Sequence, residues 1–411
     1  MIVKDYIKRF ERHGFGMFVH FGLYSNVALG EWAYNNCPGV KENYHEAFEK
    51  FNPDPDWAEK LVATAKSAGC KYITLTTRHH DGFSLYDTCG LNDYDAPHSP
   101  AGRDLIREFV DQCNAQGIIP FFYHTLLDWY EPHFNTDFPK YLEYLRASVE
   151  ILCTKYGKIG GLWFDGKWSK PNEDWEEDAL YGLIRKHQPE AMIINNTGLV
   201  ALGALGHIEL DSVTFERGKP APINLEGSPK YIASEMCQIF GDHWAYAEND
   251  FNFKSLGDII KDFCICRRYG SNLLLNVGPM GNGKLRNLDT AMLEAIGKWI
   301  EIYKDAFDGT RPTDIEVEDK PEDFLLRGED GSYYLFCHNI LMSSDPNVTP
   351  DWATNTNYLC NFKLDAKIKS VKWLESGADV EFHQNGDSVS VRTTPQPYGQ
   401  SMVVRVAKIE V

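Results

Sequence analysis

The stretch NPDPDWAEKLVATAKSAGCKYITLTTRHHDGFSLYDT, residues 52–88, indicates the fold class. Asp54-Pro55-Asp56 offers capping carboxylates and a proline at the beginning of an amphipathic helix expected over 56–68. An apolar strand is expected over 71–77, and it runs directly into the polar sequence Arg78-His79-His80-Asp81. A helix followed by a buried strand with a polar end is typical of α/β proteins.

The same alternation continues in both directions from this stretch. Strand-like apolar runs occupy residues 15–21, 71–77, 118–124, 161–165, 192–196, 212–216, 231–236 and 272–278. Amphipathic helices are expected over residues 56–68, 103–116, 139–156, 174–187, 255–269 and 287–305. Eight strands with intervening helices predict a TIM-type (β/α)8-like barrel.

The second half of this barrel is expected to be irregular. Helical patterns are missing or weak directly after the strands at 192, 212 and 231, and those connections have the composition of loops. A doubly wound open sheet is the main structural alternative. It is disfavoured because no glycine-rich phosphate-binding loop follows the first strand.

The pattern changes after Arg311-Pro312 to short, β-rich segments. These segments lie at 332–337, 357–363, 368–374 and 388–392. Asp330-Gly331 and Asn385-Gly386 are turn signals between strand-like stretches. We therefore predict a catalytic barrel over residues 1–310 and a C-terminal β-sandwich over residues 311–411.

The chain of 411 residues carries a formal net charge of −18. Such an acidic surface repels phosphate groups, so neither nucleic acid nor an anionic membrane is expected as a partner. No stretch approaches the ~20 consecutive apolar residues of a membrane span. The N-terminus has no apolar signal core, which favours a cytoplasmic protein, or a secreted one if a leader was removed. The sequence leaves open whether the chain forms a homo-oligomer.

Ten cysteines are spread along the chain, and the only close pair is Cys264-x-Cys266. No C-x-x-C pair indicates zinc, and a chain of this size does not need disulfides for stability. We therefore expect reduced thiols in the core, and neither a metal nor another cofactor.

Polar residues follow almost every expected strand, at the end where barrel enzymes carry their chemistry. They are His20, Arg78-His79-His80-Asp81, Tyr123-His124, Asp165, Asn195-Asn196, Glu216, Glu235 and Asn276. One polar residue at a strand end usually faces solvent or a turn. Eight in register predict a functional site.

The adjacent histidines His79 and His80 raise the alternative of a metal site. Neighbours on a strand point to opposite faces, so an ion would also need distant ligands such as His20 and Asp165. Histidines that form hydrogen bonds in a polar pocket are the preferred interpretation.

Trp163-Phe164-Asp165-Gly166 places a carboxylate directly after an apolar strand. Glycoside hydrolysis uses two carboxyl groups whose pKa values are pushed apart. The candidate partners are Glu216 and Glu235, which end expected strands, and Glu226, which lies in a loop flanked by glycine and proline. The residues alone do not separate Glu216 from Glu235.

Roughly residues 9–308 resemble glycoside hydrolase family 29, the α-L-fucosidases. The matching segments are FGMFVHFG at 15–22, Glu31-Trp32, the stretch 52–88, LWFDG at 162–166 and SNLLLNVGPMGNG at 271–283. The resemblance implies a retaining exo-α-L-fucosidase that needs no metal and acts on fucosylated oligosaccharides. Asp165 matches the nucleophile and Glu216 best matches the general acid/base. Glu235 matches a structural or pocket-wall group and is the runner-up acid.

The resemblance also implies a set of sugar-binding residues. Positions that hold the fucose hydroxyls match His20, Glu31, Trp32, His79 and His80. Trp163 or Trp32 would cover an apolar edge of the sugar. Either Tyr123 or His124 matches a tyrosine near the nucleophile.

One departure from the family pattern lies after the fifth strand, where IINNTGL at 193–199 lacks an arginine. Arg217, directly after Glu216, is a candidate substitute, and the preferred linkage stays open. Three alternatives are kept: a metal-dependent hydrolase, a glycosidase for a related sugar such as an α-galactoside, and a sugar-binding barrel without activity.

Overall fold

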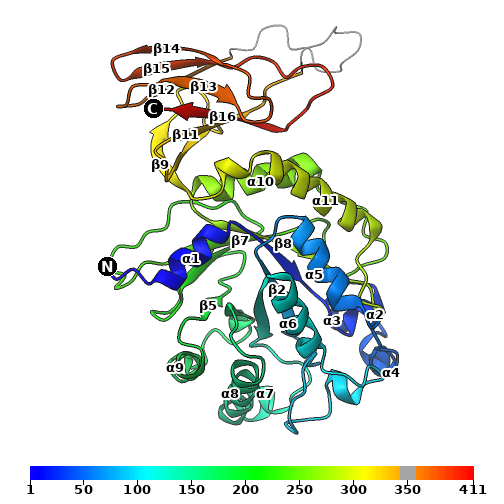
Figure 1. The fold of residues 1–411 in the computed structure, drawn as a ribbon. Helices are drawn as coiled ribbons and strands as arrows, with labels where there is room; N and C mark the ends of the chain where they lie inside the picture. The colour runs from blue at the N-terminus through cyan, green and yellow to red at the C-terminus, as the bar shows by residue number, and fades with distance from the viewer. Residues whose placement is uncertain (343–357) are drawn as a thin grey trace. The chain divides into compact units, whose positions relative to one another are not determined.

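The computed structural model describes residues 1–342 and 358–411. Eight parallel strands form a closed barrel in the order of the chain (Figure 1), as predicted. The strands are β1 (Phe15–Val19), β2 (Tyr72–Arg78), β3 (Ile119–Thr125), β4 (Gly161–Asp165), β5 (Met192–Asn195), β6 (Ser212–Glu216), β7 (Ala233–Ile239) and β8 (Asn272–Val277).

Helices connect most of these strands. The longer helices are α1 (Asp5–His13), α5 (Trp57–Ser67), α6 (Leu105–Gln116), α8 (Phe138–Lys155), α9 (Glu177–His187), α10 (Leu256–Arg268) and α11 (Asn287–Ile302). Short helical turns are α2 (Tyr24–Val27), α3 (Ala33–Asn36), α4 (His45–Glu49), α7 (His133–Thr136), η1 (Lys41–Asn43), η2 (Ala96–His98), η3 (Lys167–Ser169) and η4 (Lys304–Ala306).

Capping explains where some helices begin, but not at α5. The Asp104 side chain accepts the backbone N–H of Arg107 at the beginning of α6. At α5, the carboxylate of Asp56 makes no capping bond and instead pairs with Lys60 at 2.5 Å. The helix therefore begins at the predicted place, but the carboxylate predicted to cap it forms an ion pair instead.

The barrel is irregular between β5 and β6, where a single pair of residues, Ile194 and Ser212, forms the ladder. In the described structure, no helix lies in the connections 196–211 and 217–232. After β7 a loop over 240–254 precedes α10, which begins with a capping box of Ser255 and Asp258. The irregularity predicted for this half is thus confirmed.

The strand β7 differs from its expected position. The sequence placed the end of the seventh strand at Glu235, whereas β7 continues to Ile239. Glu235 pairs in register with Asn272, the first residue of β8. Glu235 therefore lies near the beginning of its strand, inside the barrel, and not at the end that carries the other polar residues.

A β-sandwich follows the barrel in the sequence, as predicted. One sheet has the order β13-β16-β11-β10-β9 and the other the order β12-β15-β14. The strands are β9 (Thr310–Glu316), β10 (Phe324–Gly328), β11 (Tyr333–His338), β12 (Leu359–Lys363), β13 (Ser370–Trp373), β14 (Glu381–Asn385), β15 (Ser388–Arg392) and β16 (Val404–Glu410). Apolar side chains from both sheets, among them Leu335, Phe362 and Val391, form one core.

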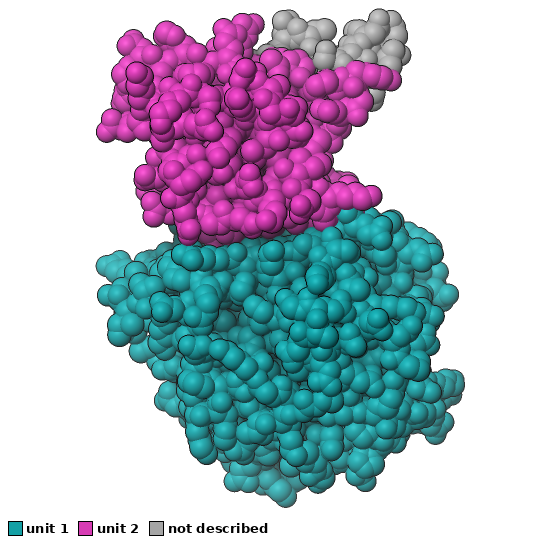
Figure 2. Space-filling view, in the orientation of Figure 1, with its two compact units in different colours: residues 1–254, 271–294 teal, residues 255–270, 295–411 magenta. Residues whose placement is uncertain are grey.

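Two compact units divide the chain (Figure 2). The first unit holds residues 1–254 and 271–294, and the second holds 255–270 and 295–411. The second unit thus includes α10 and the C-terminal half of α11, and the boundary predicted at 310/311 stays a prediction. In the described part of the chain, no helix has the length and apolar character needed to span a membrane.

Candidate active site

A pocket of about 280 Å³ lies at the carboxyl ends of the barrel strands. This volume is near the lower end of the ~300–1,000 Å³ range typical of small-ligand sites. The pocket is lined by Phe18, His20, Glu31, Trp32, His79, His80, Tyr123, Trp163, Asp165, Trp168, Asn196, Thr197, Gly198, Leu199, Val200, Glu216, Cys237 and Trp244. Nine of the predicted site residues therefore line one cavity.

Asp165 ends β4, and four donors surround its carboxylate. Asn196 Nδ2 and Trp168 Nε1 each lie 3.2 Å from Oδ1. Tyr123 Oη lies 3.4 Å and His80 Nε2 3.5 Å from Oδ2. Burial raises the pKa of Asp165, but His80 and the donors Trp168 and Asn196 outweigh it, so the pKa is below its usual value. Asp165 is held as a carboxylate.

The backbone next to Asp165 allows only glycine. Gly166 has a φ of 100°, in the left-handed region, and a Cβ there would lie 2.7 Å from the backbone nitrogen of Leu127. Leu126, which directly follows β3, donates its N–H to the Asp165 carbonyl. The glycine lets β4 turn sharply after Asp165 and leaves the carboxylate in the pocket.

Glu216 ends β6 and faces Asp165 across the pocket. The Asn196 Nδ2 group that donates to Asp165 also donates to Glu216 Oε2, at 2.6 Å. The two carboxylate oxygens therefore lie at most about 5.8 Å apart, the sum of the 3.2 Å and 2.6 Å distances. One amide thus connects the two carboxyl groups.

The surroundings of the two carboxyl groups shift their pKa values in opposite directions. Burial raises the pKa of Glu216, and the negative charge of Asp165 raises it further, against the lowering by Asn196 and Arg217. The pKa of Asp165 is lowered by its donors. The two environments therefore push the pKa values of the two carboxyl groups apart, as a nucleophile and an acid require.

Two histidines on the pocket wall are uncharged at neutral pH. Burial lowers the pKa of His20 to about 3 and that of His79 well below its usual value. Asn276 Oδ1 lies 2.6 Å from His20 Nδ1, so Nδ1 carries the proton and Nε2 is an acceptor. The Nδ1 atom of His79 is buried without a hydrogen-bond partner in the described structure. Neutral imidazoles of this kind suit sugar hydroxyls.

Glu31 is anchored by backbone N–H groups of the loop that follows β7. Its Oε2 accepts the N–H groups of Trp244, at 3.1 Å, and Ala245, at 2.9 Å. Trp32 packs against His80, with ring centroids 5.5 Å apart, and against Trp168, at 6.0 Å. Indole rings and a fixed carboxylate therefore line the same pocket.

Glu235 does not line the pocket. Trp163 Nε1 donates to its Oε1 at 2.9 Å, and the Tyr72 hydroxyl donates to Oε2. The residue is 1% exposed, and burial raises its pKa to about 7. Both carboxylate oxygens of Glu235 therefore accept hydrogen bonds inside the barrel and do not face the pocket.

Two further candidates, His124 and Glu226, are not among the residues that line the pocket. Tyr123 lines the pocket but His124 does not, because neighbours on β3 point to opposite faces. His124 is fully buried and lies 3.3 Å from the hydroxyl of Tyr86. Glu226 is exposed in the loop between β6 and β7, away from the pocket-lining residues.

Several pocket residues were not among those predicted. Asn196 was noticed only as a strand end, although an amide between two strand-end carboxylates is a natural donor. Trp168 lies three residues beyond Asp165 and points back to it. Trp244, Leu199 and Val200 come from loops after β7 and β5, where no periodicity marks them.

Comparisons with known proteins show the family of this chain. The Alpha-L-fucosidase family profile matches residues 3–305. Tissue alpha-L-fucosidase of Bos taurus is 25% identical over 342 residues, covering 75% of this chain and 70% of the bovine protein. Alpha-L-fucosidase of Dictyostelium discoideum is 23% identical and covers 93% and 88% of the two chains.

Solved structures are similar along nearly the whole chain. Alpha-L-fucosidase isoenzyme 1 from Paenibacillus thiaminolyticus superposes with a TM-score of 0.79, at 27% identity, over 98% of both chains. A GH29 alpha-L-fucosidase from Bacteroides thetaiotaomicron, solved as a trapped covalent intermediate, has a TM-score of 0.81 at 22% identity. It covers 99% of this chain and 96% of the other.

Proposed function

The chain belongs to glycoside hydrolase family 29, the α-L-fucosidase family, and from this we propose that it is a retaining exo-α-L-fucosidase. Its substrates would be terminal α-L-fucosyl residues of fucosylated oligosaccharides. The observation that carries the proposal is the Asn196 amide, which connects a lowered-pKa Asp165 and a raised-pKa Glu216 within one pocket.

The separation of the two carboxyl groups supports retention of configuration. Retaining glycosidases hold their carboxyl groups about 5–5.5 Å apart, and inverting ones about 6.5–9.5 Å. The upper bound of about 5.8 Å between Asp165 Oδ1 and Glu216 Oε2 falls below the inverting range. A water molecule placed between the carboxylates for direct attack would lack room.

The proposed first step is attack by the Asp165 carboxylate on the anomeric carbon. Glu216 donates its proton to the leaving glycosidic oxygen as the bond breaks, and a covalent fucosyl-enzyme results. In the second step, Glu216 takes a proton from water, the water oxygen attacks the same carbon, and Asp165 leaves. The Bacteroides thetaiotaomicron relative, trapped as a covalent intermediate, supports this route.

The donors around Asp165 have a second role in this mechanism. Tyr123 stays protonated because burial raises its pKa, so its hydroxyl can donate to the carboxylate. As Asp165 forms the ester and loses its charge, these hydrogen bonds weaken, and they strengthen again as the carboxylate leaves. They therefore favour the departure of Asp165 in the second step.

The sugar itself would be held by the neutral histidines and the aromatic walls. His20 and His79 offer uncharged nitrogens to hydroxyls, and Glu31 offers a carboxylate. Trp163 and Trp32 supply flat apolar faces for the methyl group and the ring C–H groups. These binding roles are proposals that follow from the position of each residue in the pocket.

The test is release of fucose by the purified chain in the presence of EDTA. An aryl α-L-fucoside, an aryl α-galactoside and a branched α1,3/4-fucosylated oligosaccharide would be compared side by side. We expect release of fucose from at least one of the two fucosides. The first product seen by NMR should be α-fucose without the β-anomer, because a retaining enzyme releases the α-anomer first. Loss of activity in EDTA that zinc restores, with no change in the unfolding temperature, would instead favour the metal-dependent alternative.

The galactoside arm tests the choice of sugar. Fucose carries a methyl group where galactose carries a hydroxymethyl group, and one such change alters binding by ~1–3 kcal/mol. We expect slower turnover of the galactoside by about ten-fold or more. Faster turnover of the galactoside would overturn the proposed sugar but leave the retaining mechanism intact.

A further inference from the structure

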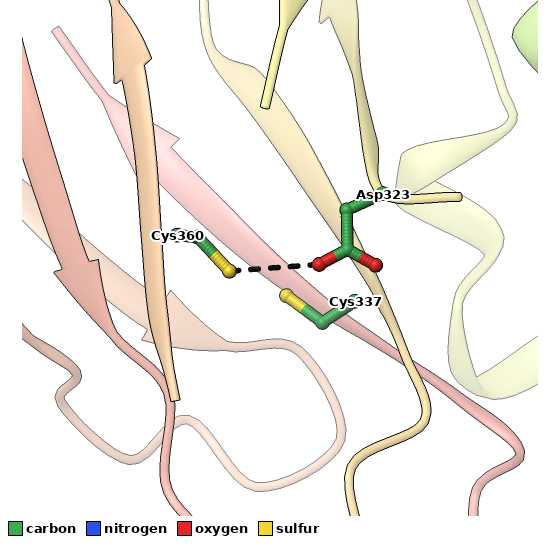
Figure 3. A group of neighbouring side chains, drawn as sticks. All are labelled: Asp323, Cys337 and Cys360. Atoms are coloured by element: carbon green, nitrogen blue, oxygen red, sulfur yellow. Dashed lines mark hydrogen bonds between the residues drawn. The ribbon is translucent and has the colours of Figure 1, made fainter. Parts of the chain in front are cut away.

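A second cluster of reactive side chains lies in the β-sandwich, outside the pocket. Asp323, Cys337 and Cys360 point toward one another from three segments (Figure 3). Asp323 directly precedes β10, and Cys337 lies in β11, the neighbouring strand. Cys360 comes from β12, in the other sheet. The cluster therefore joins the two sheets across their shared core.

One edge of the cluster has the length found in a tetrahedral zinc site. One ligand atom from each of the three residues lies within 4.8 Å of the others. Cys360 Sγ and Asp323 Oδ2 are 3.6 Å apart. Two ligands bound tetrahedrally at ~2.3 Å (sulfur) and ~2.1 Å (oxygen) are separated by about 3.6 Å. The S···O edge is thus already of the required length.

The carboxylate is oriented toward the sulfur atoms by its surroundings. Asp323 Oδ1 accepts the backbone N–H of His338 at 2.7 Å, which leaves Oδ2 directed at Cys360. His338 Nδ1 lies 3.4 Å from the same Oδ1, is buried, and makes no hydrogen bond in the described structure. The backbone N–H thus fixes the carboxylate as outer partners do in metal sites.

Burial makes a simple structural role for this carboxylate costly. Asp323 is 3% exposed, and Cys337 and Cys360 are 1% and 0% exposed. They lie among the apolar residues of the sandwich core, such as Leu335 and Phe362. A carboxylate in such a place needs a nearby cation. Lys320 Nζ, 3.6 Å from Cys360 Sγ, is the one cationic side chain that hydrogen-bonds to these three residues in the described structure.

We propose that Cys337 Sγ, Cys360 Sγ and Asp323 Oδ2 bind a zinc ion that fastens the two sheets of the β-sandwich together. Two thiolates and a carboxylate suit a borderline-soft divalent ion, and the fourth tetrahedral position is left for water. Binding releases the two thiol protons to solvent. The sequence predicted reduced thiols because these cysteines lie far apart in the chain and form no motif.

The first experiment is a titration of the full, metal-stripped and reduced protein with zinc alone. We expect one equivalent to bind tightly and to raise the unfolding temperature, because the ion binds the folded state only. Cobalt(II) alone should give ligand-field bands in the visible and a thiolate-to-cobalt charge-transfer band in the near ultraviolet. That band reports sulfur ligands, so binding to the pocket histidines would not produce it.

Variants assign the ligands. Cys337→Ser, Cys360→Ser and Asp323→Asn should each weaken zinc binding by about 100-fold or more, and the two cysteine variants should reduce the charge-transfer band. His338→Ala keeps the backbone N–H that Asp323 accepts, so it should weaken zinc binding far less than the three ligand variants. Cys89→Ser, which removes an exposed cysteine elsewhere in the chain, is the matched control and should change neither measurement.

Two results would overturn the proposal. Titration of the unfolded, unreduced protein with a thiol reagent should find all ten cysteines free once zinc is removed. Eight free thiols, with a cross-linked peptide that holds Cys337 and Cys360, would mean that the pair is a disulfide. Ten thiols without a charge-transfer band and without a shift in unfolding temperature would mean a buried thiol pair and no metal site.

Discussion

Glu216 and Glu235 lie on neighbouring barrel strands and show how depth in a barrel assigns roles. Burial raises the pKa of both side chains. Glu216 ends β6 and lines the pocket, where it shares a donor with Asp165. Glu235 lies near the beginning of β7, and both its oxygens are engaged by Tyr72 and Trp163.

The difference teaches that a raised pKa alone does not identify a catalytic acid. A general acid must also reach the proton acceptor in the substrate. Glu216 can do so from the pocket, whereas Glu235 is closed off inside the barrel. The upper layer of the barrel thus carries the chemistry, and the interior layer carries stability. The five predictions below test this division.

The largest effect is expected from Asp165→Ala. Removal of the nucleophile should lower kcat by about ten-thousand-fold or more, since no other side chain can form the fucosyl ester. The unfolding temperature should change little, because the side chain lies at the solvent-accessible pocket. Steady-state kinetics and thermal unfolding measure both. Activity within ten-fold of the parent protein would rule out Asp165 as the nucleophile.

Glu216→Ala comes next. We expect losses of about 10²–10⁴-fold with oligosaccharides, whose leaving groups need a proton, and much smaller losses with aryl fucosides. Glu235→Gln is the matched control and should leave the leaving-group dependence unchanged. If Glu235→Gln shows the strong leaving-group dependence and Glu216→Ala does not, the two roles are reversed.

Glu235 should govern how stability depends on pH. Its pKa rises from 4.5 in the unfolded chain to about 7 in the folded protein. Its contribution to stability is therefore complete below pH 4.5 and is lost as the pH rises through 7, by about 3 kcal/mol in total. Glu235→Gln resembles the protonated acid, so its stability should not decline in this window. Denaturant unfolding at pH 4.5, 6 and 8 measures the difference.

A persistent decline in the glutamine variant would assign the pH dependence to other groups. The pKa of Asp165 lies below its usual value, so that residue loses its stabilising charge only at lower pH and does not overlap with the window of Glu235. The comparison of the parent protein with Glu235→Gln therefore isolates the pH dependence that comes from Glu235.

Asn196→Ala should have a moderate effect with a distinct pH signature. Loss of a hydrogen bond to charged groups should lower kcat/KM by roughly ten-fold. Asn196 lowers the pKa of both Asp165 and Glu216, so both limbs of the pH–rate profile should move to higher pH in the variant. Asn195→Ala is the control, since Asn195 bonds to Tyr181 and does not line the pocket. Unshifted limbs would show that the amide does not couple the carboxyls.

The smallest effect is expected from Trp168→Phe. The indole donates to Asp165 Oδ1 at 3.2 Å but is 45% exposed, so its hydrogen bond is weakened by water. We expect a loss of about three-fold in kcat/KM and a slight rise of the acid limb, because this bond lowers the pKa of Asp165. A loss beyond one hundred-fold would place Trp168 in the catalytic machinery.

The sequence predicted the barrel because strand periodicity and helix signals are local. Asp165, Glu216 and the pocket histidines were found for the same reason, since each directly follows or ends a strand. The position of Glu235 was missed because polar and apolar residues are mixed from Ala233 to Ile239, so hydrophobicity does not mark where this strand ends. Trp244 and the loop residues Leu199 and Val200 were missed because only the folded chain brings them to the pocket.

The cluster of Asp323, Cys337 and Cys360 in the β-sandwich could not be predicted from the sequence either. Asp323 and Cys337 meet because β10 and β11 pair in register, and Cys360 meets them because two sheets face each other. Neither the register nor the facing of the sheets can be read from cysteine spacing. Cysteine spacing alone predicted reduced thiols, and spacing could not include these neighbours.

The connections 196–211 and 217–232 consist of loops where other barrel segments have helices. The residues Asn196 and Glu216 stand at the roots of these loops, while Leu199 and Val200 reach the mouth of the pocket. Changes of length or composition there do not require a helix to repack. For directed evolution, these two loops are therefore the segments to randomise when a different fucosyl linkage is wanted, with the reacting pair left untouched.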